Sequence, residues 1–473
     1  MASAVPTAME RPHFVGIGGA GMSGIAKILT QRGARVSGSD FRESTTVTAL
    51  RALGATVHVG HDAAHLDEDA SCVVVSSAIR DSNPELAAAR TRGLPILHRS
   101  DALAALLAGR RTIAVAGTHG KTTTTSMLAV ALRTLDLSPS YAIGGDLDVP
   151  ISNAEHGEGE LFVAEADESD RSFHRYAPEV AIILNVELDH HANYASIDEI
   201  HESFEAFVDR VQPGGTLVIN ADHEGARKLT ARLHDREDLR IVTYGEAADA
   251  DVRVLSVTPT GLSSEVVVEL DGRRLIIPVS VPGRHYAHNA VAALAAGTAA
   301  GVPSADLARA LGRYTGAQRR LQLRGEADGV RVIDTYAHHP TEMTADVQAV
   351  RDAVRGGAED PDGRRILVLF QPHLFSRTRE LGTEMGEALA LADASVVLAI
   401  YPAREDPIPG VTSELVTAGA RAAGAETHPE PDREAAVERV VGMAKPGDLV
   451  LTMGAGDVTE LGPRILARLA ERA

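Results

Sequence analysis

The chain has 473 residues, of which 44% are hydrophobic and 23% charged, and its formal net charge at pH 7 is −19. This length allows about three domains with separate cores, and so acidic a protein is unsuited to bind nucleic acid or an anionic membrane. Aromatic residues make up only 3% of the chain and tryptophan is absent, so the cores must be built from aliphatic side chains.

The sequence contains no pattern typical of export or membrane insertion. No signal-peptide core precedes the first apolar strand, and no apolar stretch is long enough to span a bilayer. Cys72 is the only cysteine and lies in an apolar run, so it cannot form an internal disulfide. We therefore expect a cytoplasmic protein without membrane insertion.

The first glycine-rich turn follows an apolar strand near the N-terminus and precedes a helix. Gly16, Gly18 and Gly21 match the pattern GxGxxG, and Asp40 ends the next strand at the distance typical of a ribose-binding carboxylate. The pattern by itself favours NAD(P), yet such a turn accommodates any pyrophosphate. The sequence therefore predicts a dinucleotide or a nucleoside diphosphate here.

Two further strands of this first domain also end in polar residues. Ser76-Ser77 follows one strand and His98-Arg99 follows the next. Open α/β sheets bind ligands beyond the carboxyl ends of their strands, so these residues are expected near the first glycine turn. The domain is expected to end near residue 109.

A second glycine-rich turn, at 117–125, joins the apolar strand 112–116 to a helix. Its glycines and the helix N-terminus suit a polyphosphate; Lys121 can reach the β- and γ-phosphates, and the Thr122 hydroxyl can bind Mg²⁺. Val115 stands where a Walker A loop carries its first glycine, so a turn without a ligand remains the alternative on the local pattern. We expect Lys121 to face solvent and to contribute little to the core.

Two strands after this turn end in groups that can bind a metal ion. The strand 160–164 runs into Glu165, which is the arrangement that supplies an anionic metal ligand beside a phosphate loop. The strand 180–184 is followed by Asp189-His190, and a neutral imidazole can bind a metal ion. A surface histidine is the ordinary alternative for His190.

A hairpin and an alanine-rich helix complete the central part of the chain. The alternating stretch 264–270 followed by Asp271-Gly272 predicts a hairpin. Asn289 lies near the expected start of the helix, where it would either cap the helix or contact a base.

The last part of the chain contains four apolar strands that alternate with helices, which predicts a third doubly wound domain. Its polar clusters are rich in arginine and histidine, in contrast to the chain as a whole. The expected strands are 330–334, 366–370, 395–400 and 449–452.

In this order the motifs resemble those of the ATP-dependent Mur ligases, from Gly16 to Asp457. The shortened GTHGKT loop is the family's own form. The resembling stretches are GIGGAGMSGIA, AGTHGKTTTTS, EADESD, the Asp189-His190 pair, GAQRRLQ, YAHHPTE, FQPH, SRTR, YPARE and GAGD.

The resemblance implies an α/β protein of three domains. Residues 1–109 would form a Rossmann-like domain that binds a UDP-sugar, 110–317 a central P-loop-type ATPase domain, and 318–473 a Rossmann-like domain that binds an amino acid. ATP would phosphorylate the carboxylate of UDP-N-acetylmuramate, and L-alanine would displace phosphate, in peptidoglycan precursor synthesis. Two Mg²⁺ ions, replaceable by Mn²⁺, would assist, and the protein would be a monomer or weak homodimer.

The resemblance and the placement of the polar clusters together predict the site residues. The catalytic set is Lys121, Glu165, His190, Arg320 and Asp334, and the metal ligands are Thr122, Glu165 and His190. ATP would be bound by Gly117, Thr118, His119, Gly120, Lys121, Thr122, Thr123, Asn289 and Arg320. The UDP-sugar would be bound by Gly18, Gly19, Ala20, Gly21, Met22, Ser23, Asp40, Ser76 and Ser77, and the amino acid by Tyr336, His338, Arg377 and Arg379.

One departure from the family pattern concerns the acids before YAHHP. The family usually carries two adjacent acids there, whereas this chain has Asp334 followed by Thr335. We expect Asp334 to fill the acidic role alone.

Three other functions fit parts of the sequence. A dehydrogenase would use the first glycine turn but leave the Lys121 loop idle, and a P-loop ATP-binding protein without ligase activity would explain only the central motifs. A ligase that adds a preformed peptide to the same UDP-sugar is nearer; GMSGIA and YAHHPTE favour addition of a single alanine.

Overall fold

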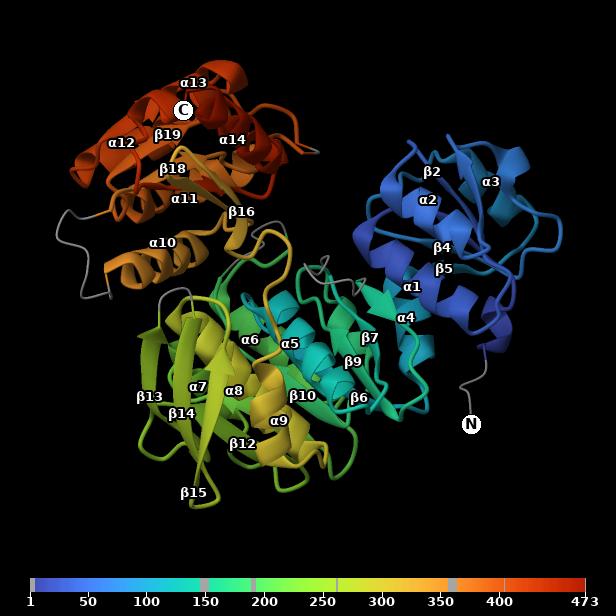
Figure 1. Ribbon diagram of the computed structural model, residues 1–473. Coiled ribbons are helices and arrows are strands. Elements are labelled where there is room, and N and C mark those ends of the chain that lie inside the picture. The colour runs from blue at the N-terminus through green and yellow to red at the C-terminus, as the bar shows by residue number, and fades with distance from the viewer. Residues whose placement is uncertain are drawn as a thin grey trace. The chain divides into compact units, whose positions relative to one another are not determined.

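The computed structural model describes residues 5–144, 153–188, 193–260, 263–355, 364–403 and 405–472. The described chain forms three β-sheets, each flanked by helices, in three consecutive stretches of sequence (Figure 1). Contacts divide it into two compact units: Met1–Val254 with Val268–Leu275 and Asn289–Tyr314, and Leu255–Val267 with Ile276–His288 and Thr315–Ala473. The predicted α/β fold with three sheets is confirmed.

The first sheet has five parallel strands in the order β3-β2-β1-β4-β5. Its middle strand β1 pairs with β2 on one side and β4 on the other, so the chain reverses its direction of progress across the sheet at this point. The carboxyl ends of β1 and β4 therefore flank a crevice of the kind where such sheets bind ligands. The strands are β1 Pro12–Val15, β2 Ser37–Asp40, β3 Thr56–Val59, β4 Cys72–Val75 and β5 Ile96–His98; the helices are α1 Ala20–Gln31, α2 Thr45–Ala52, α3 Pro84–Thr91 and α4 Arg99–Leu107, with 3₁₀ turns at Thr7–Met9 and Ala63–His65.

The second sheet has ten strands in the order β15-β14-β13-β12-β11-β10-β6-β9-β7-β8. Strand β6 lies between β9 and β10, to which it pairs in parallel, so the loops after these three strands emerge side by side. The strands are β6 Arg111–Ala116, β7 Ser140–Ala142, β8 Ala154–Glu155, β9 Leu161–Glu165, β10 Val180–Ile183, β11 Thr216–Asn220, β12 Arg240–Gly245, β13 Val252–Thr260, β14 Ser263–Leu270 and β15 Arg273–Val279. The helices are α5 Lys121–Thr134, α6 Ile197–Val208, α7 Glu224–Arg232, α8 Arg284–Ala299 and α9 Ser304–Leu311, with a 3₁₀ turn at Ser172–Arg175.

The predicted hairpin is present in this sheet. Strands β14 and β15 are neighbours and are joined by Asp271 and Gly272, whose φ angles are +51° and +71°. Positive φ at both positions is what a type I′ turn requires, and the Asp-Gly pair tolerates it.

The third sheet has six strands in the order β16-β17-β21-β18-β19-β20. All neighbouring strands are parallel except the pair β16 and β17. Strand β21 lies between β17 and β18, so the loops after these two strands flank it. The strands are β16 Gln322–Ala327, β17 Val330–Thr335, β18 Ile366–Phe370, β19 Ala394–Val397, β20 Thr427–Pro429 and β21 Leu449–Met453; the helices are α10 Pro340–Arg355, α11 Phe375–Leu389, α12 Glu414–Ala422, α13 Arg433–Met443 and α14 Leu461–Arg472, with a 3₁₀ turn at Asp457–Glu460.

The sequence predicted only four of these six strands. Strands β16 and β20 lie at the two edges of the sheet, and no residue of β16 is buried. An edge strand that is open to solvent needs no continuous apolar run, so hydrophobic patterning does not mark it.

Aliphatic side chains form the cores, as the scarcity of aromatic residues predicted. Most buried side chains are Ala, Val, Leu and Ile, although the largest fully buried ones are aromatic, such as Phe14, Phe162 and Tyr244, and α5 is buried over almost its whole length. Among the described residues, no helix combines the length and apolar character needed to cross a membrane.

Candidate functional site

A cavity of about 530 Å³ lies at the carboxyl ends of β1 and β4, where the sheet order predicted a crevice. It contains most of the first glycine turn and residues that follow β2 and β4. The lining residues are Gly16, Gly18, Gly19, Gly21, Met22, Asp40, Arg42, Ser44, Thr46, Ser76, Ala78, Ile79 and Arg99.

Asp40 holds the first glycine turn in shape. The Gly18 N–H donates to Oδ2 of Asp40 at 2.8 Å, and a Cβ at Gly18 would lie only 2.9 Å from that oxygen. Gly16 has a φ of +78°, a conformation that favours glycine. The carboxylate that was predicted to contact a ribose thus has a structural partner in the turn as well.

Two of the predicted residues of this site do not line the cavity. Ser23 is buried within α1, and its hydroxyl accepts a hydrogen bond of 3.5 Å from the Asn153 amide. The Ser77 hydroxyl lies 3.0 Å from Nε2 of His98. The structure does not describe the side chain of Ala20.

The second glycine turn connects β6 to α5 and approaches the chain after β10 closely. Gly117 and Gly120 have φ angles of +136° and +87°. A Cβ at Gly117 would lie 3.0 Å from Cβ of Leu184, and one at Gly120 would lie 2.8 Å from Oδ1 of Asn289. Glycine is needed here both for the backbone conformation and for the close packing.

Asn289 therefore faces the phosphate loop. It lies in the second turn of α8, which begins at Arg284, so the alternative that it caps this helix is wrong. Its side chain is almost fully buried against Gly120.

Lys121 does not face solvent, in contrast to the prediction. Its side chain is only 13% exposed, and its ammonium donates to the carbonyl oxygens of Gly117 and Thr118 and to Oε1 of Glu168, at 2.6, 3.1 and 2.9 Å. The reason is that the loop curls around the ammonium while Glu168, only 3% exposed, closes the other side. Burial opposes the charge, but Glu168, Asp167 and Glu165 outweigh it and raise the pKa of Lys121.

Thr122 and Glu165 meet as the sequence predicted. The Thr122 hydroxyl lies 3.2 and 3.1 Å from the two carboxylate oxygens of Glu165, and the Gly144 N–H donates to Oε2 at 2.7 Å. A hydroxyl and a carboxylate are the ligands that Mg²⁺ prefers, so this pair fits a metal ion that is bound with nucleotide phosphates. The third predicted ligand, His190, lies outside the described residues, as does Asp189.

The carboxylate next to this pair is strongly acidic. Burial by itself would raise the pKa of Asp167, but Lys121, the hydrogen bonds from Ser169 and the charge of Arg99 lower it to about 2. Asp167 is therefore ionised at neutral pH.

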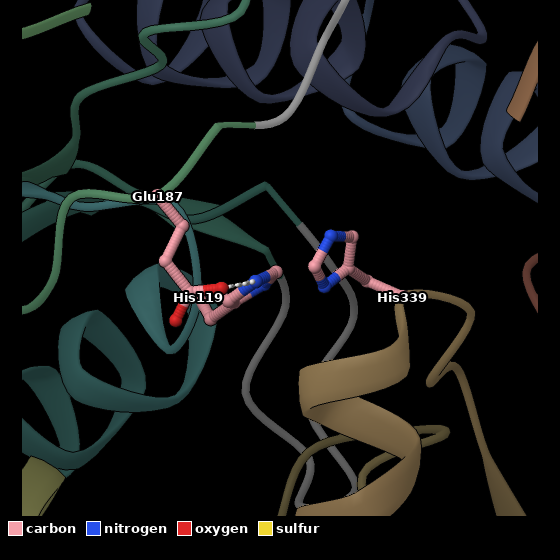
Figure 2. A group of neighbouring side chains, drawn as sticks. All are labelled: His119, Glu187 and His339. Atoms are coloured by element: carbon pink, nitrogen blue, oxygen red, sulfur yellow. Dashed lines mark ion pairs between the residues drawn. The ribbon is translucent and has the colours of Figure 1, made fainter. Parts of the chain in front are cut away.

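The chain after β10 stabilises the phosphate loop through hydrogen bonds. The Asn185 side chain makes two hydrogen bonds to the backbone of His119: it accepts from N–H at 2.7 Å and donates to C=O at 3.0 Å. The Glu187 N–H donates to the Thr118 hydroxyl at 2.9 Å. Figure 2 shows the Glu187 carboxylate beside the imidazole of His119, with 3.6 Å between Oε2 and Nε2.

In the C-terminal unit, Asp334 is fully buried at the end of β17. Its oxygens accept from the hydroxyls of Thr452 and Thr459, both at 2.7 Å, and from Nε of Arg319 at 3.3 Å. The neighbouring Thr335 donates to Asp346. Within this unit Asp334 thus anchors Arg319 and two threonine hydroxyls, and Thr335 anchors Asp346.

Arg319 and Arg320 surround the ring of Tyr336. Their guanidinium carbons lie 4.9 and 5.5 Å from the ring centroid, and the Tyr336 N–H donates to the Arg319 carbonyl at 2.7 Å. Arg320 also forms a long ion pair of 3.9 Å with Glu342.

His338 lies in a half-buried cluster with His373 and the buried Arg377, as the meeting of the loops after β17 and β18 predicts. The rings of His338 and His373 are 5.8 Å apart, and His373 stacks on Tyr401 at 5.7 Å. Burial lowers the pKa of His338 to about 3; Arg377 and His373 add to this effect, and Glu342 opposes it. The imidazole is therefore neutral at physiological pH.

Arg379 does not join this cluster. It is 54% exposed and pairs with Glu380 at 2.7 Å. Arg377 and Arg379 are both on α11, and residues two apart on a helix point to different faces, so the prediction that they converge is wrong for this conformation.

Sequence reasoning missed several residues of these sites. Asn185 and His373 each follow a strand within three residues, so the rule about strand carboxyl ends could have marked them, as it marked Arg99. Glu168 also follows β9 by three residues, but only the fold shows that it pairs with Lys121.

Three family models match consecutive parts of the chain. They are described as the Mur ligase family catalytic domain at residues 11–111, the Mur ligase middle domain at 115–297, and the Mur ligase glutamate ligase domain at 319–456. Together they match well over half of the chain.

Curated relatives match over the full length. The UDP-N-acetylmuramate–L-alanine ligase of Streptomyces coelicolor is 74% identical over 471 residues, which cover 100% of both chains. The enzyme of the same name from Thermobifida fusca is 52% identical over 98% of this chain and 97% of its own.

Solved structures agree with these matches. The crystal structure of the UDP-N-acetylmuramate–alanine ligase from Thermotoga maritima has a TM-score of 0.80 at 29% identity, over 98% of this chain and 100% of the other. A murein peptide ligase from Psychrobacter arcticus has a TM-score of 0.69 at 24% identity over 97% and 98% of the two chains, which shows a shared fold alone. With its phosphate loop, its paired Thr122 and Glu165 and these full-length matches, the chain belongs to the Mur ligase family.

Proposed function

We propose that the protein joins L-alanine to the carboxylate of UDP-N-acetylmuramate at the expense of ATP, a step of peptidoglycan precursor synthesis. The observation that carries the proposal is the meeting of Thr122 and Glu165 at the N-terminus of α5, beside Lys121. Relatives at 74% to 70% identity that bear the name of this ligase support the choice of substrates.

The reaction requires an activated acyl group, because a carboxylate is a poor acyl donor at neutral pH. The γ-phosphoryl group passes from ATP to the muramyl carboxylate, which gives ADP and an acyl phosphate. The amine of alanine then attacks the acyl carbon, and phosphate leaves from a tetrahedral intermediate. Phosphoryl transfer depends mainly on alignment and on charge neutralisation.

The phosphate loop between β6 and α5 supplies both the alignment and the charge neutralisation that ATP needs. Lys121 holds the β- and γ-phosphates, the backbone of residues 117–123 surrounds them, and Asn289 contacts the nucleotide beside Gly120. Arg320 neutralises charge on the transferred group. Mg²⁺ ions, when bound by Thr122, Glu165 and His190, lower the charge repulsion between the γ-phosphate and the acceptor carboxylate.

The cluster of Tyr336, His338 and Arg377 binds the incoming amino acid. Arg377 pairs with the alanine carboxylate, which a buried guanidinium suits. His338 is neutral and its Nδ1 lies 3.0 Å from the Tyr336 carbonyl, so Nδ1 carries the proton and Nε2 is left to accept a hydrogen bond. It therefore contributes an acceptor rather than a second cation.

The three domains of this enzyme are residues 1–109, 110–317 and 318–473. The enzyme acts in the cytoplasm. The limits of the three sheets, β1 to β5, β6 to β15 and β16 to β21, support these boundaries. The protein acts as a monomer or weak homodimer.

Phosphate release with a panel of substrates tests the proposed function. We expect release that requires ATP, Mg²⁺, UDP-N-acetylmuramate and L-alanine together. Equal or faster release with a preformed tripeptide in place of alanine would identify a peptide ligase instead, and hydrolysis that ignores the UDP-sugar would leave only an ATPase.

The first glycine turn provides a test of the UDP-sugar site. Gly18→Ala is expected to raise KM for UDP-N-acetylmuramate by roughly 10-fold, because the new Cβ displaces the Asp40 carboxylate that shapes the turn. KM for ATP should stay within about twofold. Steady-state kinetics checks both constants, and equal weakening of the two nucleotides would contradict separate sites.

The pair Asp334 and Thr335 provides a second test. Asp334→Asn is expected to lower kcat by roughly 10-fold or more, since one oxygen that anchors Arg319 becomes an amide nitrogen. Thr335→Ala should be milder in kcat. Steady-state kinetics compares the loss of kcat in the two variants, and melting curves verify that both are folded. A larger loss of kcat in Thr335→Ala would place the functional group at the Thr335 hydroxyl.

A further inference from the structure

Asp346 lies on α10 and contacts two segments that are far apart in the sequence. Its side chain is only 10% exposed, and its two carboxylate oxygens have different partners. Oδ2 accepts a hydrogen bond from the hydroxyl of Thr335 at the end of β17, and Oδ1 lies 3.3 Å from Nε2 of His285 near the start of α8. None of these three side chains takes part in the reaction steps given above.

On one side, the contacts of Asp346 reach the loop that is proposed to bind alanine. The buried hydroxyl of Thr335 accepts from the Ala337 N–H at 3.2 Å and donates its own proton to Asp346. Glu342, one turn before Asp346 on α10, accepts from the His338 N–H at 3.2 Å. Two acids of α10 thus hold the backbone of the loop after β17.

On the other side, the contacts of Asp346 reach the helix that carries Asn289. His285 and Asn289 are one turn apart on α8 and therefore lie on the same face of this helix. The chain just before α8 packs closely against α10, since a Cβ at Gly283 would lie 2.7 Å from Cβ of Ala349. A carboxylate only accepts hydrogen bonds, so Asp346 presents an acceptor to Nε2 of His285.

The contact with Asp346 also explains the threonine at position 335, where the family pattern has an acid. An aspartate at 335 would bring a second carboxylate against Oδ2 of Asp346, and two carboxylates in contact resist being ionised together. A hydroxyl at 335 donates to the carboxylate instead. The pair therefore consists of one carboxylate and one hydroxyl, contributed by two different elements.

We propose that Asp346 is a positioning residue of the ligation reaction and supplies, from α10, the carboxylate that the family pattern places at 335. It holds the alanine-binding loop through Thr335 and the start of the ATP-binding helix α8 through His285. This inference rests on the proposed function, which assigns alanine to the loop of His338 and ATP to Asn289. Because Asp346 acts through these neighbours, its loss should affect both alanine and ATP.

An exchange of the two residues tests the inference. Thr335→Asp alone brings two carboxylates together, and Asp346→Thr alone leaves no carboxylate. Each should lower kcat/KM for alanine by roughly 10- to 100-fold, as expected for the loss of a charge-assisted hydrogen bond. The double variant Thr335→Asp, Asp346→Thr restores one carboxylate and one hydroxyl, and should recover to within about threefold of the wild type. Two residues with separate packing roles would show no such recovery, because their losses would add.

Asp346→Asn tests the charge at nearly constant volume. The amide presents a donor to one of the two partners, so kcat/KM for alanine should fall several-fold and the Kd of a non-hydrolysable ATP analogue should rise several-fold. KM for UDP-N-acetylmuramate should stay within about twofold. Asp352→Asn is the matched control, because it removes an exposed acid of the same helix that accepts from the Gln348 amide at 2.6 Å, and should leave all three constants unchanged. Melting curves verify that each variant is folded.

Two results would overturn the inference. The first is a folded exchange variant that is no more active than the poorer of the two single variants. The second is unchanged alanine and ATP constants in Asp346→Asn, which decides the matter if the exchange variant does not fold. A failure of the proposed function is distinct, because binding of the ATP analogue requires no ligation. A wild-type protein that ligates nothing, together with weaker binding of the analogue in Asp346→Asn, would refute the function and leave Asp346 as a positioning residue of the ATP site.

Discussion

Lys121→Ala is expected to reduce ligation to less than about 1% of the wild-type rate, because it removes the cation that holds the β- and γ-phosphates. The structure adds a second effect on stability. The variant breaks the ion pair between Lys121 and Glu168, whose side chains are 13% and 3% exposed, and removing one partner of a buried pair costs about 3 kcal/mol. A loss of activity in this variant alone therefore does not distinguish the missing phosphate-binding cation from a less stable fold.

The double variant Lys121→Ala, Glu168→Gln separates the two effects. The neutral amide at 168 needs no cation, so the melting temperature should recover toward that of the wild type while ligation remains lost. Single-turnover phosphate release and thermal melting measure the two quantities. If the double variant is stable and keeps more than a few per cent of wild-type turnover, the assignment of the central site is wrong.

Glu165→Gln gives an independent check of the same site. The amide fits the space of the carboxylate beside Thr122 but has lost the charge that a divalent cation requires. Turnover should fall as it does for Lys121→Ala, and a moderate increase in Mg²⁺ should not restore it. Recovery at high Mg²⁺ would show that Glu165 contributes only to metal affinity.

The fold could be predicted from the sequence wherever a strand is buried. Strands β4, β6, β9, β10 and β11 are mostly apolar runs, since helices cover both faces of a parallel sheet, whereas β3 lies at the edge of the first sheet, is partly exposed and was not predicted. Strands β16 and β20 could not be predicted in the same way, because an edge strand is partly solvated and carries no such run.

The candidate sites were predictable to the extent that they depend on local backbone. Glycine turns and residues at strand ends have a position that the sequence order determines, so the meeting of Thr122 with Glu165 follows from parallel strands β6 and β9. The environment of Lys121 could not be derived, because it depends on the path of a loop that returns Glu168 to the ammonium. The separation of Arg377 from Arg379 follows from helical periodicity, because residues two apart on a helix point to different faces.

Arg377 is expected to determine the affinity for alanine. Charge-assisted hydrogen bonds contribute about 1.5–3 kcal/mol each, so Arg377→Ala should lower kcat/KM for alanine by roughly 10- to 100-fold. Arg377→Lys should also be impaired, because an ammonium cannot replace the planar fork. KM values for ATP and UDP-N-acetylmuramate should remain nearly constant.

Arg379→Ala is the matched control, since it removes an arginine from the same helix. In the structure this arginine is exposed and paired with Glu380, so its loss should change kcat/KM for alanine by less than about twofold. His338 adds a condition on pH: its pKa is lowered to about 3, so it stays neutral and should add no titration step to the alanine kinetics near neutrality. Wild-type saturation with alanine in Arg377→Ala would end the assignment, and a loss in Arg379→Ala as large as in Arg377→Ala would show that both arginines bind the carboxylate during turnover.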